Sequence, residues 1–182
     1  MAVDRSHLLV VALALGSALG GFGLSVWLHP ARLPQTAALV DTTRPALELP
    51  GLDGKRTSIA HWDGRLVLLN FWASWCGPCV EEMPVLDRAQ QRHAVAGLQI
   101  VGIAADSAQA TRDFLGRHPV AYPILVDDPD LVPNGRDSAV IYGNDRSILP
   151  YSVLIGRDGR ILAQHYGNFS ESSLDAWLKP YL

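Results

Sequence analysis

The stretch "NFWASWCGPCVEEMP", residues 70–84, contains both cysteines of this 182-residue chain, Cys76 and Cys79. Two intervening residues let both thiols lie in the first turn of a helix, where their sulfurs can close a small disulfide ring. A helix N-terminus favours an anion, and the thiolate is the reactive form of cysteine. Gly77-Pro78 keeps the loop tight, since proline is tolerated in a first turn. The pair therefore predicts redox chemistry, with metal binding and an inert structural disulfide as alternatives.

The segments around the cysteines alternate between expected strands and expected helices. The apolar run Leu66–Phe71 predicts a strand buried on both faces, and a helix should follow from near Cys76 to about His93. Further along, we expect a buried strand at Leu98–Ala104, a helix at Ala108–Arg117 and a short strand at Ile124–Val126. Strands that alternate with helices predict a layered α/β domain.

The remaining segments predict hairpins, one long loop and a terminal helix. Residues 45–64 carry the turn signal Asp53-Gly54, and a second hairpin should join Ser152–Ile155 to Arg160–Tyr166. Residues 127–149 are expected to form an irregular loop with one helical turn. The tail, residues 170–179, places Leu174, Trp177 and Leu178 on one helical face.

The N-terminus predicts a membrane segment. Leu8–Leu28 is a run of 21 residues without a charge, long enough to span a bilayer, and Arg5 precedes it on the side expected to stay in the cytoplasm. We therefore expect residues 1–28 to be a membrane anchor, 29–44 a linker and 45–182 the folded domain. The alternative is a cleaved signal peptide with Ala18-Leu19-Gly20 as its cleavage site. Under both interpretations the folded domain is exported from the cytoplasm.

Composition narrows the possible partners. The net charge of −3 and the pI of about 6.0 argue against a nucleic-acid partner, because no basic stripe is available to neutralise phosphates. Two thiolates do not fill a tetrahedral zinc site, and the histidines offer no companion spacing. We therefore expect no metal and no cofactor.

The motif itself resembles a known family. The segment "FWASWCGPC" is similar to the active-site segment of the thioredoxin superfamily. The longer pattern "DGKRTSIAHWDGRLVLLNFWASWCGPCVEEMPVL", residues 53–86, resembles the membrane-anchored TlpA-like thiol-disulfide oxidoreductases, a group that includes ResA and CcmG, and the likeness extends over residues 45–182. It implies a thioredoxin-like α/β fold, with a central mixed sheet flanked by helices. To this the group adds an N-terminal β-hairpin, a central helix/strand insert and a transmembrane helix.

The resemblance also implies roles for matching residues. Cys76 would attack the disulfide of a partner, and Cys79 would resolve the mixed disulfide. Pro150 matches a cis-proline that lies opposite the active site in this family. The surface that contacts a substrate would then include Trp75, Gly77, Pro78 and Leu149.

Two positions bear on proton transfer. Where thioredoxin itself has a buried aspartate, this chain has Asn70, which cannot titrate. Glu82 matches an acidic position of the TlpA-like group and lies one helical turn after Cys79, so it can reach the same region. If it is buried, its pKa rises toward the range useful for acid-base work. The alternative is a surface glutamate, as we expect for Glu81.

These observations together predict an exported thiol-disulfide oxidoreductase, held at the inner membrane with its catalytic domain on the periplasmic side. It would act on cysteines of other exported proteins, such as apocytochrome c or the copper-site cysteines of an oxidase. The thioredoxin-type Gly77-Pro78 favours a reductant, supplied by a transmembrane electron donor of the DsbD or CcdA type. The segment "YGNDRSILP" before Pro150 is longer than usual in the family, which makes the loop a candidate for partner selectivity. The alternatives are a CxxC copper carrier and a peroxiredoxin-like peroxidase.

Overall fold

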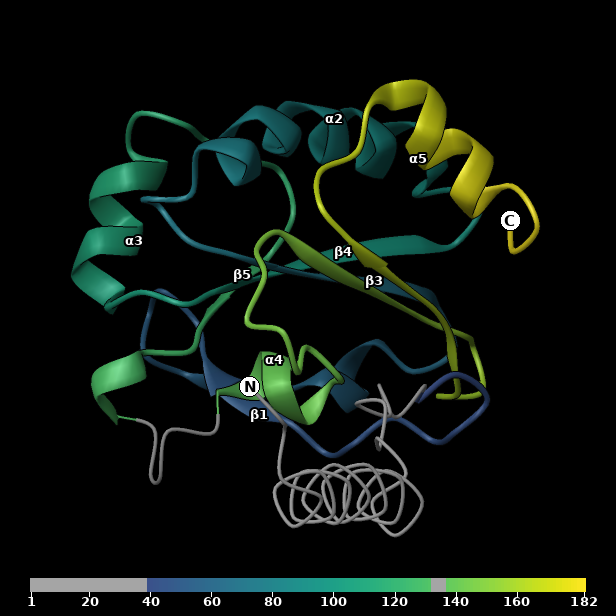
Figure 1. Ribbon diagram of the computed structural model, residues 1–182, viewed down its shortest axis with the longest axis horizontal. Coiled ribbons are helices and arrows are strands. Elements are labelled where there is room, and N and C mark those ends of the chain that lie inside the picture. The colour runs from purple at the N-terminus through teal and green to yellow at the C-terminus, as the bar shows by residue number, and fades with distance from the viewer. Residues whose placement is uncertain (1–38, 132–136) are drawn as a thin grey trace, which may run out of the picture. The chain divides into compact units, whose positions relative to one another are not determined.

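The structure, a computed structural model, describes residues 39–131 and 137–182. At its centre is a five-stranded sheet with the strand order β5-β4-β3-β6-β7 (Figure 1). β3, β4 and β5 are parallel, whereas β6 and β7 are antiparallel to their neighbours, so the sheet is mixed as predicted. The strands are β3 (Leu66–Trp72), β4 (Leu98–Ala104), β5 (Ile124–Val126), β6 (Tyr151–Ile155) and β7 (Ile161–Tyr166).

Strand β3 is buried along its whole length, which explains its nearly continuous apolar sequence. Its side chains alternate between two cores. Leu66, Leu68 and Trp72 belong to the core on one face of the sheet, and Leu69 and Phe71 belong to the core on the other. Successive residues of β3 therefore contribute to opposite cores, one on each face of the sheet.

Three helices cover one face of the sheet (Figure 1): α2 (Gly77–His93), α3 (Ala108–Leu115) and α5 (Glu171–Leu178). The predicted helix at Ala108–Arg117 ends two residues early, because Gly116 is the C-cap. The C-terminal helix begins after Ser170, whose hydroxyl accepts a hydrogen bond from the backbone N–H of Ser173.

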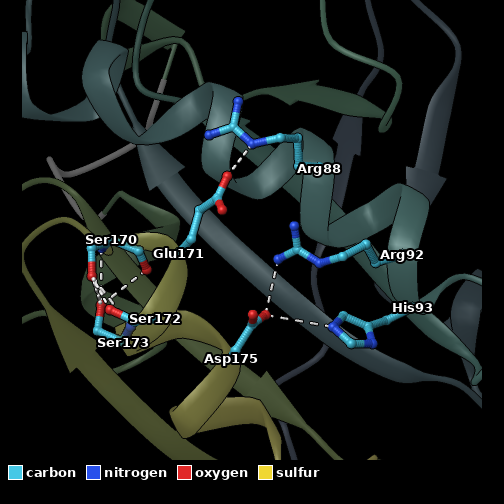
Figure 2. Close-up of polar contacts among 8 residues, drawn as sticks. All are labelled: Arg88, Arg92, His93, Ser170, Glu171, Ser172, Ser173 and Asp175. Atoms are coloured by element: carbon cyan, nitrogen blue, oxygen red, sulfur yellow. Dashed lines mark hydrogen bonds and ion pairs between the residues drawn. The ribbon is translucent and has the colours of Figure 1, made fainter.

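Helix α5 packs along α2, and charged side chains join their exposed edges (Figure 2). Arg88 pairs with Glu171, and Arg92 Nη2 lies 2.9 Å from Asp175 Oδ1. Exposed ion pairs of this kind stabilise a fold only slightly. The larger contribution comes from Leu174 and Leu178, which are fully buried beneath them.

The opposite face of the sheet carries the predicted N-terminal hairpin and the described part of the loop at 127–149. The hairpin consists of β1 (Glu48–Pro50) and β2 (Arg56–Ser58), and η1 (Ile59–Trp62), a 3-10 helix, follows it. The described part of the long loop contains η2 (Pro129–Leu131), also a 3-10 helix, and α4 (Ser138–Ile141), the single helical turn that the sequence predicts.

The start of the domain differs from the prediction. Residues 39–44 were assigned to a linker, but they pair with the start of β7: Asp41 N–H donates to Ile161 O at 2.8 Å, and Arg44 N–H donates to Gly159 O at 2.9 Å. The domain therefore begins no later than Leu39. This pairing uses backbone groups, which leave no periodicity in the side chains for a sequence pattern to detect.

The predicted membrane anchor, residues 1–28, lies outside the described residues. Within 39–131 and 137–182, no helix is both long enough and apolar enough to cross a bilayer.

We expect Arg44→Ala to lower the free energy of unfolding by about 1–2 kcal/mol, because the Arg44 side chain is 12% exposed and pairs with Asp63 at 2.7 Å. Arg56→Ala is the matched control, since Arg56 and its partner Glu48 are both exposed, and should cost less than about 1 kcal/mol. Urea unfolding measures both values. Equal losses would mean that the 39–44 segment contributes little to the fold.

Candidate active site

Cys76 and Cys79 form a disulfide at the N-terminus of α2, with an S–S distance of 2.04 Å. Cys76 is the N-cap residue of the helix, and its sulfur accepts a hydrogen bond from the backbone N–H of Cys79 at 3.3 Å. After reduction, the same N–H and the helix dipole are in place to stabilise a Cys76 thiolate.

The two sulfur-bearing residues differ in access to solvent. Cys76 is 6% exposed and Cys79 is 1% exposed, so Cys76 is the more accessible member of the pair. Trp75 is 72% exposed, and Gly77 and Pro78 are also on the surface. An incoming partner therefore meets Trp75 and Cys76 first.

The loop before the disulfide is held by a carboxylate that the sequence analysis missed. Asp106 Oδ2 accepts a hydrogen bond from Ser74 N–H at 2.6 Å, and Ala105 N–H donates to Trp72 O at 2.8 Å. Asp106 lies two residues after the last residue of strand β4. The sequence could have indicated Asp106 as a site residue. Parallel neighbouring strands end at the same edge of the sheet, so the residues that follow β4 lie near the cysteine loop that follows β3.

The peptide bond between Leu149 and Pro150 is cis, as the family resemblance implies. Pro150 immediately precedes β6, which pairs with β3, so it approaches the same edge of the sheet as the disulfide. A hollow of about 270 Å³ lies beside it, lined by Trp75 and Leu149 at the surface and by Phe71, Ile103 and Ala139 from the core. Most of its lining is apolar.

The loop leading into Pro150 is held firmly by polar contacts. Asn144 is bonded twice to the backbone of Ile148, through its amide nitrogen at 2.9 Å and its amide oxygen at 3.2 Å. Tyr151 and Tyr166 donate their hydroxyls to the carbonyls of Tyr142 and Gly143, respectively. Ile148 nevertheless remains exposed.

Glu82 is fully buried behind the disulfide, so the surface alternative considered for it is wrong. Asn70 Nδ2 donates to Glu82 Oε1 at 2.5 Å, and the backbone N–H of Phe169 donates to Oε2 at 2.8 Å. Burial raises the pKa of Glu82 from 4.5 to about 7, although the bonds from Phe169 and Asn70 oppose the rise. Glu81, one position earlier, is exposed as expected.

Ser152 and Phe169 complete the surroundings of Glu82, and neither was identified from the sequence. Ser152 Oγ accepts a hydrogen bond from Asn70 Nδ2 at 3.1 Å. The Phe169 ring stacks on His165 at 4.0 Å between ring centroids and packs against Trp177. Phe169 lies 87 positions after Glu82, and only the docking of α5 brings them together.

In the stretches that the structure describes, no group of three or more histidine, cysteine or acidic side chains is arranged to hold a metal ion.

Comparison with known proteins identifies the family. The Redoxin family model matches residues 39–178, which is most of the chain and starts where the described domain starts. This chain belongs to the Redoxin family. Among curated relatives of this Redoxin protein, the thiol-disulfide oxidoreductase ResA of Bacillus anthracis is 29% identical over 136 residues, covering 74% of each chain. ResA of Bacillus subtilis is 28% identical and covers 74% of this chain and 71% of its own.

Solved structures agree with this assignment. A thioredoxin-family thiol:disulfide interchange protein from Chlorobium tepidum is 26% identical with a TM-score of 0.64, covering 78% of this chain and 96% of that one. A thiol-disulfide oxidoreductase from Bacteroides fragilis has the same identity and TM-score, covering 78% and 100%. The Redoxin protein is thus a thiol-disulfide oxidoreductase of the ResA/CcmG type within the thioredoxin superfamily.

The raised pKa of Glu82 predicts an unusual pH dependence of stability. Between pH 4.5 and about 7 the folded protein binds one more proton than the unfolded chain, because only the folded-state carboxyl is still protonated. The free energy of unfolding of the oxidised protein should therefore fall as the pH rises through this window, by on the order of 3 kcal/mol from this group.

Chemical unfolding at a series of pH values measures this slope. Glu82→Gln should remove it, whereas Glu81→Gln, at an exposed position of the same helix, should keep it. A slope that persists in Glu82→Gln would assign it to another group.

Proposed function

We propose that this protein is an exported thiol-disulfide oxidoreductase that reduces disulfides or mixed disulfides in other exported proteins. The observation that supports it best is the Cys76–Cys79 disulfide at the start of α2, with a buried acid of pKa about 7 behind it. This arrangement provides an accessible attacking thiol, an enclosed resolving thiol and a group that exchanges a proton near neutral pH.

In the reducing direction, the Cys76 thiolate attacks one sulfur of the partner disulfide and forms a mixed disulfide, and the partner's other sulfur leaves as a thiolate. Cys79 then loses its proton and attacks the Cys76 sulfur. The second partner sulfur leaves, and the Cys76–Cys79 disulfide is formed again. Two electrons pass to the partner, which takes up two protons.

Glu82 supplies the base that the second step needs. Cys79 is almost completely enclosed, so water has little access to its proton, and Asn70 cannot accept one. Glu82 lies one helical turn after Cys79, and its pKa of about 7 lets it take up and release a proton near neutral pH. Its hydrogen bonds from Asn70 and Phe169 keep the carboxylate in place between turnovers.

The substrate is a polypeptide that carries cysteines. The exposed Trp75, the apolar hollow next to it and Ile148 offer contacts for residues that flank a reacting cysteine. Relatives of this chain are named thiol-disulfide oxidoreductase ResA, and apocytochrome c is a candidate substrate by analogy with the family that the sequence resembles. We therefore propose apocytochrome c, or the copper-site cysteines of an oxidase, as substrates.

The location proposed for the domain is the periplasmic side of the inner membrane. The uncharged run Leu8–Leu28 supports this placement. A reductant in an oxidising compartment needs electrons from across the membrane, and we propose a DsbD- or CcdA-type transporter as the donor. The thioredoxin-type Gly77-Pro78 dipeptide supports the reducing direction.

Trapping experiments test the chemistry. Cys79→Ser should accumulate a mixed disulfide between Cys76 and an exported protein, because the resolving thiol is missing, and Cys76→Ser should accumulate none. Non-reducing electrophoresis followed by mass spectrometry identifies the trapped partner. Alkylation of the reduced protein at mildly acidic pH should label Cys76 first. Preferential labelling of Cys79 would reverse the two roles.

Export is tested separately. A periplasmic reporter fused after Pro45 should be active and should sediment with membranes, because residues 1–28 are expected to remain attached. A mature N-terminus near Gly21, determined by mass spectrometry, would exclude the anchor but leave export intact. An inactive reporter would exclude export.

A further inference from the structure

The loop that joins α4 to β6 (Figure 1) forms one wall of the hollow beside the disulfide. Asn144, Ser147 and Leu149 line the hollow from this loop, and Trp75 lines it from the cysteine loop. A polypeptide that forms a mixed disulfide with Cys76 passes close to Trp75, which is the exposed residue next to it in the chain. The hollow is therefore within reach of the residues that flank the reacting cysteine of a substrate.

Asn144 braces this loop from inside. Its side chain is bonded to both backbone groups of Ile148, donating to the carbonyl at 2.9 Å and accepting from the N–H at 3.2 Å. Its own backbone N–H donates to Ala139 O at 2.8 Å, which ties the loop to α4. Asn144 is 2% exposed, so water cannot easily replace these bonds. The amide thus holds the two ends of the loop at a fixed separation.

Ser147 indicates that these contacts impose the shape of the loop. Its φ is 51°, in the left-handed region that residues other than glycine rarely adopt, and its N–H donates to Asn144 O at 3.4 Å. Such a conformation persists only where the surrounding structure determines it. Tyr166 adds a further attachment, because its hydroxyl donates to Gly143 O at 2.9 Å. The wall that faces the hollow is therefore built before a substrate arrives.

The hollow is suited to a single apolar side chain. Its inner part is formed by Phe71, Ile103 and Ala139, which belong to the core on that face of the sheet. Its volume is about 270 Å³. Sites for small-molecule ligands occupy roughly 300–1,000 Å³, so this one is better matched to one side chain of a polypeptide. Transfer of that side chain from water to the hollow favours association.

Two carboxylates also line the hollow, but both are engaged in holding α4. Asp127 Oδ2 accepts hydrogen bonds from the backbone N–H of Ser138, at 2.7 Å, and from its hydroxyl. Asp137 is the N-cap of α4, and its Oδ1 accepts from Val140 N–H at 2.8 Å. Because these carboxylates already stabilise the helix, the apolar groups of the lining decide what the hollow accepts.

We propose that Asn144 is a specificity-determining residue, which braces the 144–149 loop so that the hollow accepts one large apolar side chain beside the reacting cysteine of a substrate. The occupant is a side chain such as leucine or phenylalanine. It is held there because the same polypeptide is joined covalently to Cys76 in the mixed disulfide. The proposal rests on the proposed function only for the polypeptide nature of the substrate, and it holds for either direction of electron flow.

The test uses the reduced full-length protein and peptides of the pattern Gly-Gly-X-Cys-X-Gly-Gly, oxidised to their homodimeric disulfides. X is alanine, leucine, phenylalanine or lysine. Each reaction oxidises Cys76 and Cys79 to the disulfide and releases two peptide thiols, whose appearance gives the rate constant. The leucine and phenylalanine peptides should react about tenfold faster than the alanine peptide, a factor that corresponds to partial burial of one large apolar side chain.

Asn144→Ala removes both bonds to Ile148 and should reduce the preference for leucine over alanine to about threefold or less. Asn144→Asp keeps the bond from the Ile148 N–H and should give an intermediate preference. Gln90→Ala is the matched control. Gln90 is also a buried amide bonded twice to backbone, to Leu98 O at 3.2 Å and to Ile100 N–H at 2.6 Å, but on the face of the sheet that the helices cover. Its loss should lower the melting temperature and keep the preference.

Ala105→Leu tests the hollow without altering Asn144. Ala105 is half-buried in the lining, and its backbone bond to Trp72 O does not depend on its side chain. The larger side chain fills part of the hollow and should remove the preference, which keeps the test decisive if a variant of Asn144 does not fold.

Three results would overturn the proposal: equal rates for the four peptides, a fastest reaction with the lysine peptide, or a preference that survives in folded Asn144→Ala or Ala105→Leu. In each of these cases the protein still exchanges disulfides with a polypeptide, so the proposed function stands. Absence of reaction with every peptide would contradict both.

Discussion

The parallel pairing of β3 with β4 is the constraint on which the rest of the structure depends. The register joins Leu66 to Leu98 and runs without interruption to Trp72 and Ala104. Both strands therefore end at the same edge of the sheet, where one continues into the cysteine loop and the other into Asp106. The hydrogen bond from Ser74 N–H to Asp106 then fixes the loop against its neighbour, so the geometry of the disulfide follows from the register of two buried strands.

Features that depend on residues close together in the sequence could be predicted correctly from the sequence alone. The apolar run at β3, the disulfide spacing and the start of α2 follow from local patterns, and the structure confirms them. The cis bond before Pro150 could be expected only because the segment resembles a family. The 39–44 segment was assigned to a linker, since backbone pairing to β7 leaves no mark on side-chain pattern.

The environment of Glu82 shows why contacts between segments far apart in the sequence could not be predicted from the sequence alone. Its spacing from Cys79 placed it on the correct side of the helix but left open whether it was buried. That question is decided by Phe169 and by the packing of α5, both contributed from the far end of the chain. The same contacts create a conflict between stability and function, because a carboxyl enclosed enough to exchange protons near neutral pH weakens the fold when it ionises.

The central position of β3 has a consequence for the motions available to the site. The strand is buried along its whole length and bonded to β4 on one side and β6 on the other, so its amides should exchange with solvent only when the whole domain unfolds. Asn70 lies in the middle of this strand. Local opening of the sheet therefore gives water no path to Glu82 from the side of Asn70. The part of the backbone expected to open least often thus lies directly under the carboxyl group that exchanges a proton.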